Sequence, residues 1–139
     1  MNADFVVDAS MALAWVLPSQ ASPEADALLE RIEAGAGSVV PMFWYLEVAN
    51  GLLVADRRKV ITGSQRQRSL ERLAALTLTV DDGEARNSFG RTSALAEQHG
   101  LSVYDAAYLE LALRRNLPLG TRDRALRSAA KRSGIPRLD

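Results

Sequence analysis

The sequence predicts a three-layer α/β/α fold with a mostly parallel central sheet of four to five strands. Short apolar runs alternate along the chain with longer stretches of helical periodicity. Strands that are separated by helices usually pair in parallel and are covered by helices on both faces. The chain has 139 residues without an internal repeat or a linker-like tract, so we expect a single domain over residues 1–139.

Short apolar runs, each bounded by turn-forming residues, predict the strands. Pro41 is expected to prevent extension of the second strand, because proline cannot donate a hydrogen bond to a neighbouring strand. Asp81-Asp82-Gly83 is interpreted as a turn after the third strand. The strands are predicted at 5–8, 38–40, 76–80 and 117–121, with a short last strand at 135–138.

The segments between these runs carry apolar residues at helical spacing. Ser22 and Pro23 provide the N-cap and the first position of one helix, and Ser102 is placed to cap the helix that contains Asp105. The segment 43–54 is apolar nearly all round, which predicts that its helix is buried. The helices are predicted at 11–17, 23–34, 43–58, 63–75, 84–98, 105–113 and 124–133.

Four acidic residues stand beside apolar segments where a solvated charge would be out of place: Asp8, Glu47, Asp105 and Asp123. Asp8 ends the first strand, and open α/β sheets bind their ligands beyond the carboxyl ends of strands. Glu47 lies on the apolar helix, where burying an unpaired carboxylate costs several kcal/mol. Asp105 opens another apolar helix, and Asp123 follows a late strand. Together the four predict a metal site at one edge of the sheet.

Three of these acids also have an ordinary structural interpretation. Asp105 and Asp123 could favour a helix dipole from the first turn, at roughly 0.3–1 kcal/mol each. Asp8 could be a turn residue that hydrogen-bonds its own backbone. Taken singly, structure is favoured at Asp105 and Asp123, function at Glu47, and neither at Asp8. The joint arrangement favours a shared site more than any single residue does.

The donor atoms of these side chains indicate the class of metal. Crowded carboxylates repel one another, which raises the pKa of at least one unless a divalent cation neutralises them. An all-oxygen set without histidine suits Mg²⁺ or Mn²⁺ and argues against zinc, copper and iron. We expect Asp8 and Asp105 to be the principal ligands, with Glu47 and Asp123 binding directly or through water. The side chains expected to orient the carboxylates by hydrogen bonds are Ser10, Asn50 and Thr121.

Charge is unevenly distributed although the net charge is zero. Through Asp56 there are one basic and eight acidic residues, whereas from Arg57 onward there are sixteen basic and nine acidic residues. Arginine binds phosphate bidentately, so a basic rim around an acidic pocket would suit a nucleic-acid backbone. Charge alone favours solvated helix faces instead. Combined with the four acids, however, the distribution favours a nucleic-acid substrate.

Composition narrows the remaining classes. The chain has no cysteine, which excludes disulfides, thiolate catalysis and zinc–thiolate sites. No apolar run approaches the roughly 18 residues of a membrane span, and Met1-Asn2-Ala3-Asp4 carries an acid in place of a basic leader region. We therefore expect a soluble cytoplasmic protein.

Four motifs containing these acids stand in order along the chain. They are Val6-Val7-Asp8-Ala9-Ser10, Leu46-Glu47-Val48-Ala49-Asn50, Val103-Tyr104-Asp105-Ala106-Ala107-Tyr108 and Gly120-Thr121-Arg122-Asp123. In type, order and separation they resemble the motifs of the PIN-domain nucleases, and within that family those of the small bacterial toxins of the VapC type. The resemblance extends from about residue 5 to the end of the chain.

This resemblance implies a Mg²⁺-dependent endoribonuclease in which Asp8, Glu47, Asp105 and Asp123 are catalytic. It also implies a homodimer that is held inactive by a cognate antitoxin, whose C-terminal segment occupies the groove near the acids. The apolar segment 43–58 independently favours association through one face. RNA is preferred over DNA by resemblance alone, because no feature of the sequence reads a 2′-hydroxyl.

Two other classes compete with this interpretation. A phosphotransfer domain also places an aspartate after its first strand. One type requires a second aspartate where Ser10 stands, and another requires a lysine after a late strand, where Leu119-Gly120-Thr121 offers none. A non-catalytic PIN-like binding module would usually have lost an acid, whereas all four are present. Tyr104 and Tyr108 are expected to pack in the core or at an interface rather than against bases.

Overall fold

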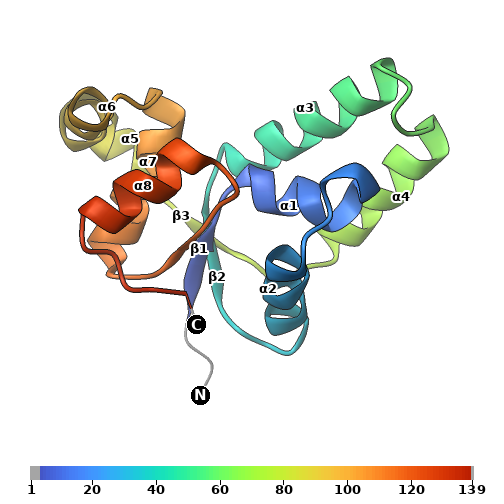
Figure 1. Cartoon of the computed structure of the whole chain (residues 1–139), viewed down its shortest axis with the longest axis horizontal. Helices are drawn as coiled ribbons and strands as arrows, with labels where there is room; N and C mark the ends of the chain where they lie inside the picture. Colours follow the sequence, from blue (N-terminus) through green and yellow to red (C-terminus); the bar gives the residue numbers. More distant parts are fainter. Residues whose placement is uncertain (1–3, 139) are drawn as a thin grey trace.

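The computed structural model describes residues 4–138 and contains a sheet of four parallel strands in the order β3-β2-β1-β4 (Figure 1). Parallel pairing runs through the whole sheet, with Val6 opposite Val39 on one side and Leu119 on the other. The predicted α/β class is therefore confirmed. The strands are β1 (Phe5–Val7), β2 (Ser38–Pro41), β3 (Thr79–Asp81) and β4 (Leu119–Gly120).

Helices cover both faces of this sheet, as Figure 1 shows. On one side lie α1 (Ala9–Val16), the 3-10 turn η1 (Pro18–Gln20), α2 (Pro23–Glu33), α3 (Trp44–Arg57) and α4 (Gly63–Ala74). On the other side lie α5 (Glu84–Asn87), the π-helical turn η2 (Ser88–Thr92), α6 (Ser93–His99), α7 (Val103–Arg115) and α8 (Arg124–Arg132). Within residues 4–138, no helix is long and apolar enough to cross a membrane.

Side-chain caps begin most of the longer helices. Ser22 and Ser102 cap α2 and α7 as predicted, because their hydroxyl oxygens accept backbone N–H groups that have no partner within the helix. Thr62 caps α4 and forms a reciprocal capping box with Gln65. Asp8 caps α1, which therefore begins two residues earlier than predicted. These local bonds fix the residues at which the helices begin.

The structure corrects the predicted bounds of the strands, and β1 and β4 are shorter than the predicted 5–8 and 117–121. Pro41 is the last residue of β2 and pairs with Asp81, so the strand includes the proline that was expected to lie beyond its end. Asp81 is consequently a buried strand residue, and its Oδ2 accepts the Gly83 N–H over 2.9 Å, so the predicted turn begins at the end of β3. The third strand is 79–81, and the preceding Leu76 and Leu78 pack on the core in an irregular connection. Residues 135–138 form no strand, although Ile135 and Leu138 pack against the core.

The core lies on both faces of β1, whose three residues are fully buried. Buried alanines let the helices lie close to this strand, with Ala12 on α1 and Ala106 on α7. Gly51 allows an equally close contact between α3 and α1, because a Cβ at this position would lie 2.7 Å from Leu13 Cδ1. The start of α3 is thereby held beside the carboxyl end of β1.

The prediction that α3 is buried all round is wrong. Its buried side chains, including Trp44, Val48 and Leu52, form a single stripe. Tyr45 and Leu46 are 43% and 74% exposed on the opposite side. The helix therefore has apolar side chains on two sides, one packed in the core and one exposed to solvent in the isolated chain.

Candidate functional site

Asp8 is buried at the carboxyl end of β1, and both of its carboxylate oxygens are hydrogen-bonded. Ser10 Oγ donates to Oδ1 over 2.6 Å, and the Met11 N–H donates to the same oxygen over 3.2 Å. The Thr121 hydroxyl donates to Oδ2. The carboxylate thus accepts a backbone N–H, as expected if Asp8 has a structural role. Two hydroxyls also fix its orientation.

The loop after β4 is joined to the start of α1 through these same hydroxyls. Thr121 Oγ1 accepts the Asp123 N–H over 3.0 Å, and Ser10 Oγ accepts the Arg122 N–H over 2.9 Å. Asp123 then caps α8, since its Oδ1 accepts the Leu126 N–H over 2.8 Å. Two segments distant in sequence therefore meet at the carboxyl edge of the sheet, as the motifs predict.

Glu47 lies in the first turn of α3 and is partly buried. Its Oε1 accepts a hydrogen bond from the Tyr108 hydroxyl over 2.5 Å, and Tyr108 is only 1% exposed on α7. Phe43 packs edge-on against the Tyr108 ring with centroids 5.3 Å apart. Asn50, one turn beyond Glu47, is exposed and has no side-chain hydrogen bond within residues 4–138, so it does not orient a carboxylate in this structure.

Electrostatic repulsion links the four acids. Burial raises the pKa of Asp8, and the charge of Asp105 raises it further, against the hydrogen bonds that lower it. Burial also raises the pKa of Glu47, with additional repulsion from Asp105 and Asp8. The pKa of Asp105 is raised by burial and then by Asp123. Each acid is therefore close enough to another to affect its protonation.

The acids converge without forming a closed ligand shell. Within the described part of the chain, no group of three or more acidic or histidine side chains is arranged to hold a metal ion. The local hydrogen bonds account for this arrangement, because Asp8 is directed at two hydroxyls, Glu47 at Tyr108 and Asp123 at the backbone of α8. The predicted ligand set is thus brought to one region, with its carboxylates engaged by the protein itself.

Residues 5–132 match the family model of the PIN domain. The chain belongs to the PIN-domain family. PIN domains are generally nucleases, and the match spans all four acidic motifs of this chain. No curated protein sequence matches the chain.

Solved structures show the same fold. The structure of PAE2754 from Pyrobaculum aerophilum has a TM-score of 0.68 and 22% identity, over 93% of this PIN domain and 86% of that chain. The structure of FitAcB from Neisseria gonorrhoeae has a TM-score of 0.59 and 17% identity, over 91% and 93% respectively. At these identities the likeness concerns the architecture.

Sequence reasoning missed two residues at the centre of this PIN domain. Tyr108 was assigned to packing alone, yet its hydroxyl holds Glu47, and the signal was that a buried tyrosine hydroxyl usually has a partner. Arg122 had no individual role in the prediction. Its backbone is held by Ser10, which places an exposed arginine between Thr121 and Asp123.

Asp81, an acidic residue outside the four-acid site, is paired with arginines of the same PIN domain. Asp81, at the end of β3, is paired with Arg114 over 2.7 Å and with Arg115 over 2.8 Å. The hydrogen bonds from Arg114 hold the pKa of Asp81 well below its ordinary value. Arg114 also pairs with Glu110 over 2.8 Å. This network joins α7 to β3 and is structural, in contrast to the four acids that repel one another.

Proposed function

We propose that this PIN domain is a Mg²⁺-dependent endoribonuclease that hydrolyses RNA phosphodiester bonds. The observation that carries the proposal is the convergence of Asp8, Glu47, Asp105 and Asp123 at the carboxyl edge of the sheet, where burial, and then the charges of neighbouring acids, raise the pKa of the first three. Carboxylates gathered at a cost in free energy, at the edge where α/β sheets bind ligands, are typical of a functional site. Membership of the PIN-domain family supports the same activity.

The chemistry of these side chains fits a divalent cation. They offer only oxygen atoms, which suits Mg²⁺ or Mn²⁺, and a cation would offset both the burial of these carboxylates and the repulsion between them, which together raise their pKa values. Asp8 and Asp105 would be the principal ligands, with Glu47 and Asp123 directly or through water. A bound Mg²⁺ supplies an activated water and neutralises charge on the phosphate.

The surrounding residues have roles of their own in this proposal. Ser10 and Thr121 hold the Asp8 carboxylate in one orientation, and Tyr108 does the same for Glu47. Arg122, exposed beside Asp123, is suited to attract a phosphate of the substrate. Removal of one orienting hydroxyl should therefore lower the rate of cleavage while all four acids remain in place.

The same proposal makes the chain a cytoplasmic toxin of a toxin–antitoxin pair. Its support is the set of four motifs shared with toxins of the VapC type, together with the PIN-domain family match. A cognate antitoxin would occupy the groove near the acids and prevent access of RNA. Expression of the chain without a partner should then arrest growth, and the Asp8→Asn variant should not.

We further propose that the chain is a homodimer. Large apolar side chains are exposed at the starts of α3 and α7, and one of them, Leu46, is 74% exposed. The others at these two helix starts are Met42, Tyr45, Val103 and Tyr104. A patch of this kind is more apolar than a monomer surface usually is. Sedimentation at micromolar concentration should show a dimer that Leu46→Glu dissociates, and a wild-type monomer would contradict this proposal.

A second candidate function is a non-catalytic nucleic-acid-binding module. The observation that favours it is that no three acids within residues 4–138 are arranged around a common metal position. Such a module would bind RNA through its arginines, with an affinity that falls steeply with salt, and would show no turnover.

Cleavage of a structured RNA pool by the purified chain distinguishes the two candidates. The wild type is expected to cut with Mg²⁺ and not with a chelator, whereas Asp8→Asn should be inactive under both conditions. Asp26→Asn provides a matched control, because Asp26 is an exposed acid on α2. If wild type and Asp8→Asn are equally inactive in preparations that mass spectrometry shows to be free of a bound partner, the binding module is the better assignment.

A further inference from the structure

A pocket lies beyond one edge of the sheet, between α2 and α8. The sheet ends at β4, and residues 135–138, which were predicted as a further strand, form no strand beside it. Figure 1 shows the end of the chain passing between α2 and α8. This α2–α8 pocket has a volume of about 790 Å³, which is large enough for a small molecule. None of the four acids of the candidate site lines it.

Aliphatic side chains form the apolar wall of the α2–α8 pocket. Leu119, Ile135 and Leu138 are only partly buried, so each leaves apolar surface open to the pocket. Met11 and Leu28, which are buried, contribute from α1 and α2. No aromatic side chain in the described part of the chain lines the pocket, so a nucleobase would find no ring on which to stack. The wall therefore suits a flexible aliphatic chain.

The polar side of the pocket is positively charged. Arg127 and Lys131 lie four residues apart on α8, so they share one helix face, and both are exposed. Neither forms an ion pair with a carboxylate of residues 4–138. Arg127 donates one N–H to the Thr121 carbonyl over 2.8 Å, which leaves other donors of its guanidinium for a ligand. An anionic group would complement these two cations.

The pocket also adjoins two residues that hold Asp8. The Thr121 hydroxyl and the Met11 N–H both donate to the Asp8 carboxylate. The same two residues line the pocket. A molecule bound in the pocket would therefore contact residues that position Asp8.

We propose that the α2–α8 pocket is a binding site for a small molecule, a medium-chain fatty acid. Its carboxylate pairs with Arg127 and Lys131, and its aliphatic chain packs on the apolar wall of Leu119, Ile135 and Leu138. An RNA backbone would match the charges but would gain nothing from this wall. The inference goes beyond the proposed nuclease function, because it assigns a ligand to a pocket that contains none of the four acids.

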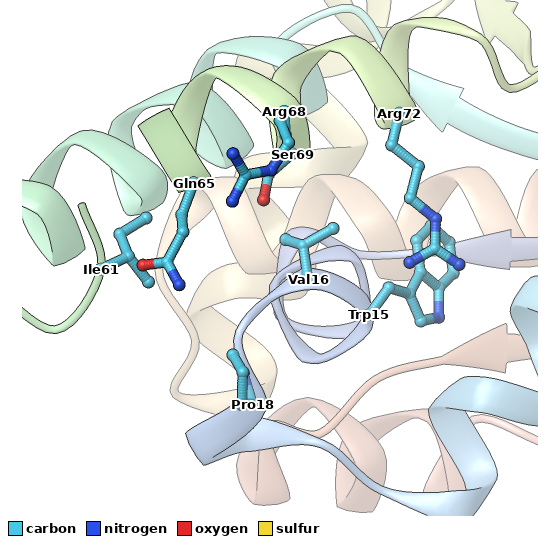
Figure 2. A pocket seen from close by; sticks show the side chains of 8 residues that line it. All are labelled: Trp15, Val16, Pro18, Ile61, Gln65, Arg68, Ser69 and Arg72. Atoms are coloured by element: carbon cyan, nitrogen blue, oxygen red, sulfur yellow. The ribbon is translucent and has the colours of Figure 1, made fainter. Parts of the chain in front are cut away.

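Another hollow of the chain supplies a matched control. It lies between α1 and α4 and has a volume of about 380 Å³. Figure 2 shows Arg68 and Arg72 extending from α4 beside it. These two arginines are also four residues apart and exposed. Reversal of both charges therefore repeats the change made at Arg127 and Lys131 without touching the α2–α8 pocket.

Calorimetry with decanoate, kept below the concentration at which it forms micelles, measures binding to the whole chain. The wild type should bind decanoate saturably. Arg127→Glu/Lys131→Glu should weaken binding at least about tenfold, because attraction becomes repulsion. The control Arg68→Glu/Arg72→Glu should stay within about twofold of wild type. Decanol, which has the same chain without the charge, should bind at least about tenfold more weakly than decanoate.

NMR of isotope-labelled methionine methyl groups locates the bound acid. The Met11 signal should shift on addition of decanoate, because Met11 lines the pocket. The signal of Met42, which is 62% exposed just before α3, should not. Ala27→Phe places a ring in the pocket from the exposed side of α2 without a change of charge, and should weaken binding at least about threefold.

Several results would overturn the proposal. They include an absence of saturable binding, equal weakening by the two double variants, and equal binding of decanol and decanoate. A shift of Met42 with Met11 unchanged would place the acid on the exposed apolar side chains near α3.

Two further results would assign the pocket to another ligand. A shift of Met11 by an RNA oligonucleotide and not by decanoate would assign it to nucleic acid. Binding of the chain to anionic phospholipid vesicles without binding of decanoate would assign it to a membrane lipid. If circular dichroism shows that the double variant is unfolded, Lys131→Glu replaces it, keeps the bond from Arg127 to Thr121, and should weaken binding at least about threefold. None of these measurements depends on RNA cleavage.

Discussion

The Tyr108 hydroxyl donates a hydrogen bond to the Glu47 carboxylate over 2.5 Å and so joins α7 to α3 across the acidic site. Burial and the charge of Glu47 raise the pKa of Tyr108 far above its ordinary value, which keeps the hydroxyl protonated as the donor. In return, this bond lowers the pKa of Glu47 against the burial that raises it. A residue assigned to packing by the sequence therefore also lowers the pKa of a proposed ligand.

Replacement of Tyr108 by phenylalanine should destabilise the fold by about 1–2 kcal/mol, because the Glu47 carboxylate loses a charge-assisted hydrogen bond while the ring packing is kept. Denaturant unfolding measures the loss. Tyr104→Phe is the matched control, since Tyr104 is 65% exposed and its hydroxyl makes no hydrogen bond within residues 4–138. Equal losses in the two variants would mean that the bond to Glu47 contributes nothing.

Replacement of Asp105 by asparagine should raise the thermal midpoint at neutral pH in the absence of divalent cations. The pKa of Asp105 is raised in the folded state by burial and by Asp123, so the folded protein retains this proton to higher pH than the unfolded chain does. The free energy of unfolding therefore falls as the pH rises from the pKa of Asp105 in the unfolded chain, about 3.9, to its higher pKa in the folded protein. Above the folded-state pKa the full loss of stability is present. The gain from Asp105→Asn should therefore disappear below about pH 4, which melting curves across pH will show.

Addition of Mg²⁺ should stabilise the wild type more than it stabilises Asp105→Asn. A ligand that binds only the folded state contributes about 1.4 kcal/mol at a concentration of about ten times Kd. Melting with Mg²⁺, compared with a K⁺ control of equal ionic strength, measures this contribution without any RNA. Identical shifts in wild type and variant would remove Asp105 from the proposed ligands.

Replacement of Asp81 by asparagine should cost about 2–3 kcal/mol, because Arg114 and Arg115 would lose their shared carboxylate at a side chain that is 2% exposed. The pKa of Asp81 is lower in the folded protein than in the unfolded chain. Asp81 therefore contributes its full stabilisation above the unfolded-state pKa of about 3.9, and this stabilisation is lost as the pH falls towards the folded-state pKa. The difference between wild type and variant should therefore narrow in acid. Asp82→Asn, at an exposed neighbour, should change stability by less than about 0.5 kcal/mol.

Features with local signals were predictable from the sequence. The β-branched run before Asp8 indicated a buried strand, and Ser22 and Ser102 indicated the starts of α2 and α7. The parallel sheet followed from the alternation of strands and helices. Asp8 and Thr121 were expected at the same sheet edge, and they meet there in a hydrogen bond.

Features that depend on distant partners were not predictable. Asp81 has the sequence signature of a turn, but its burial at the end of β3 and its pairing with Arg114 and Arg115 depend on residues more than 30 positions away. The exposed side of α3 also escaped, because hydrophobicity alone does not distinguish a side chain in the core from one left for an interface, as Leu46 shows. Asn50 shares a helix with Glu47, yet its side chain rotates into solvent.

The bond between Thr121 and Asp8 spans 113 positions of the chain. A growing polypeptide therefore possesses Asp8 and Glu47 long before it possesses the hydroxyl that orients Asp8, or Asp123 beside it. Because sequence-distant contacts form last and domains emerge from the ribosome N-terminus first, the acidic site is completed only near the end of synthesis. A chain that ends before residue 121 therefore lacks the hydroxyl that fixes Asp8 and the fourth acid of the site.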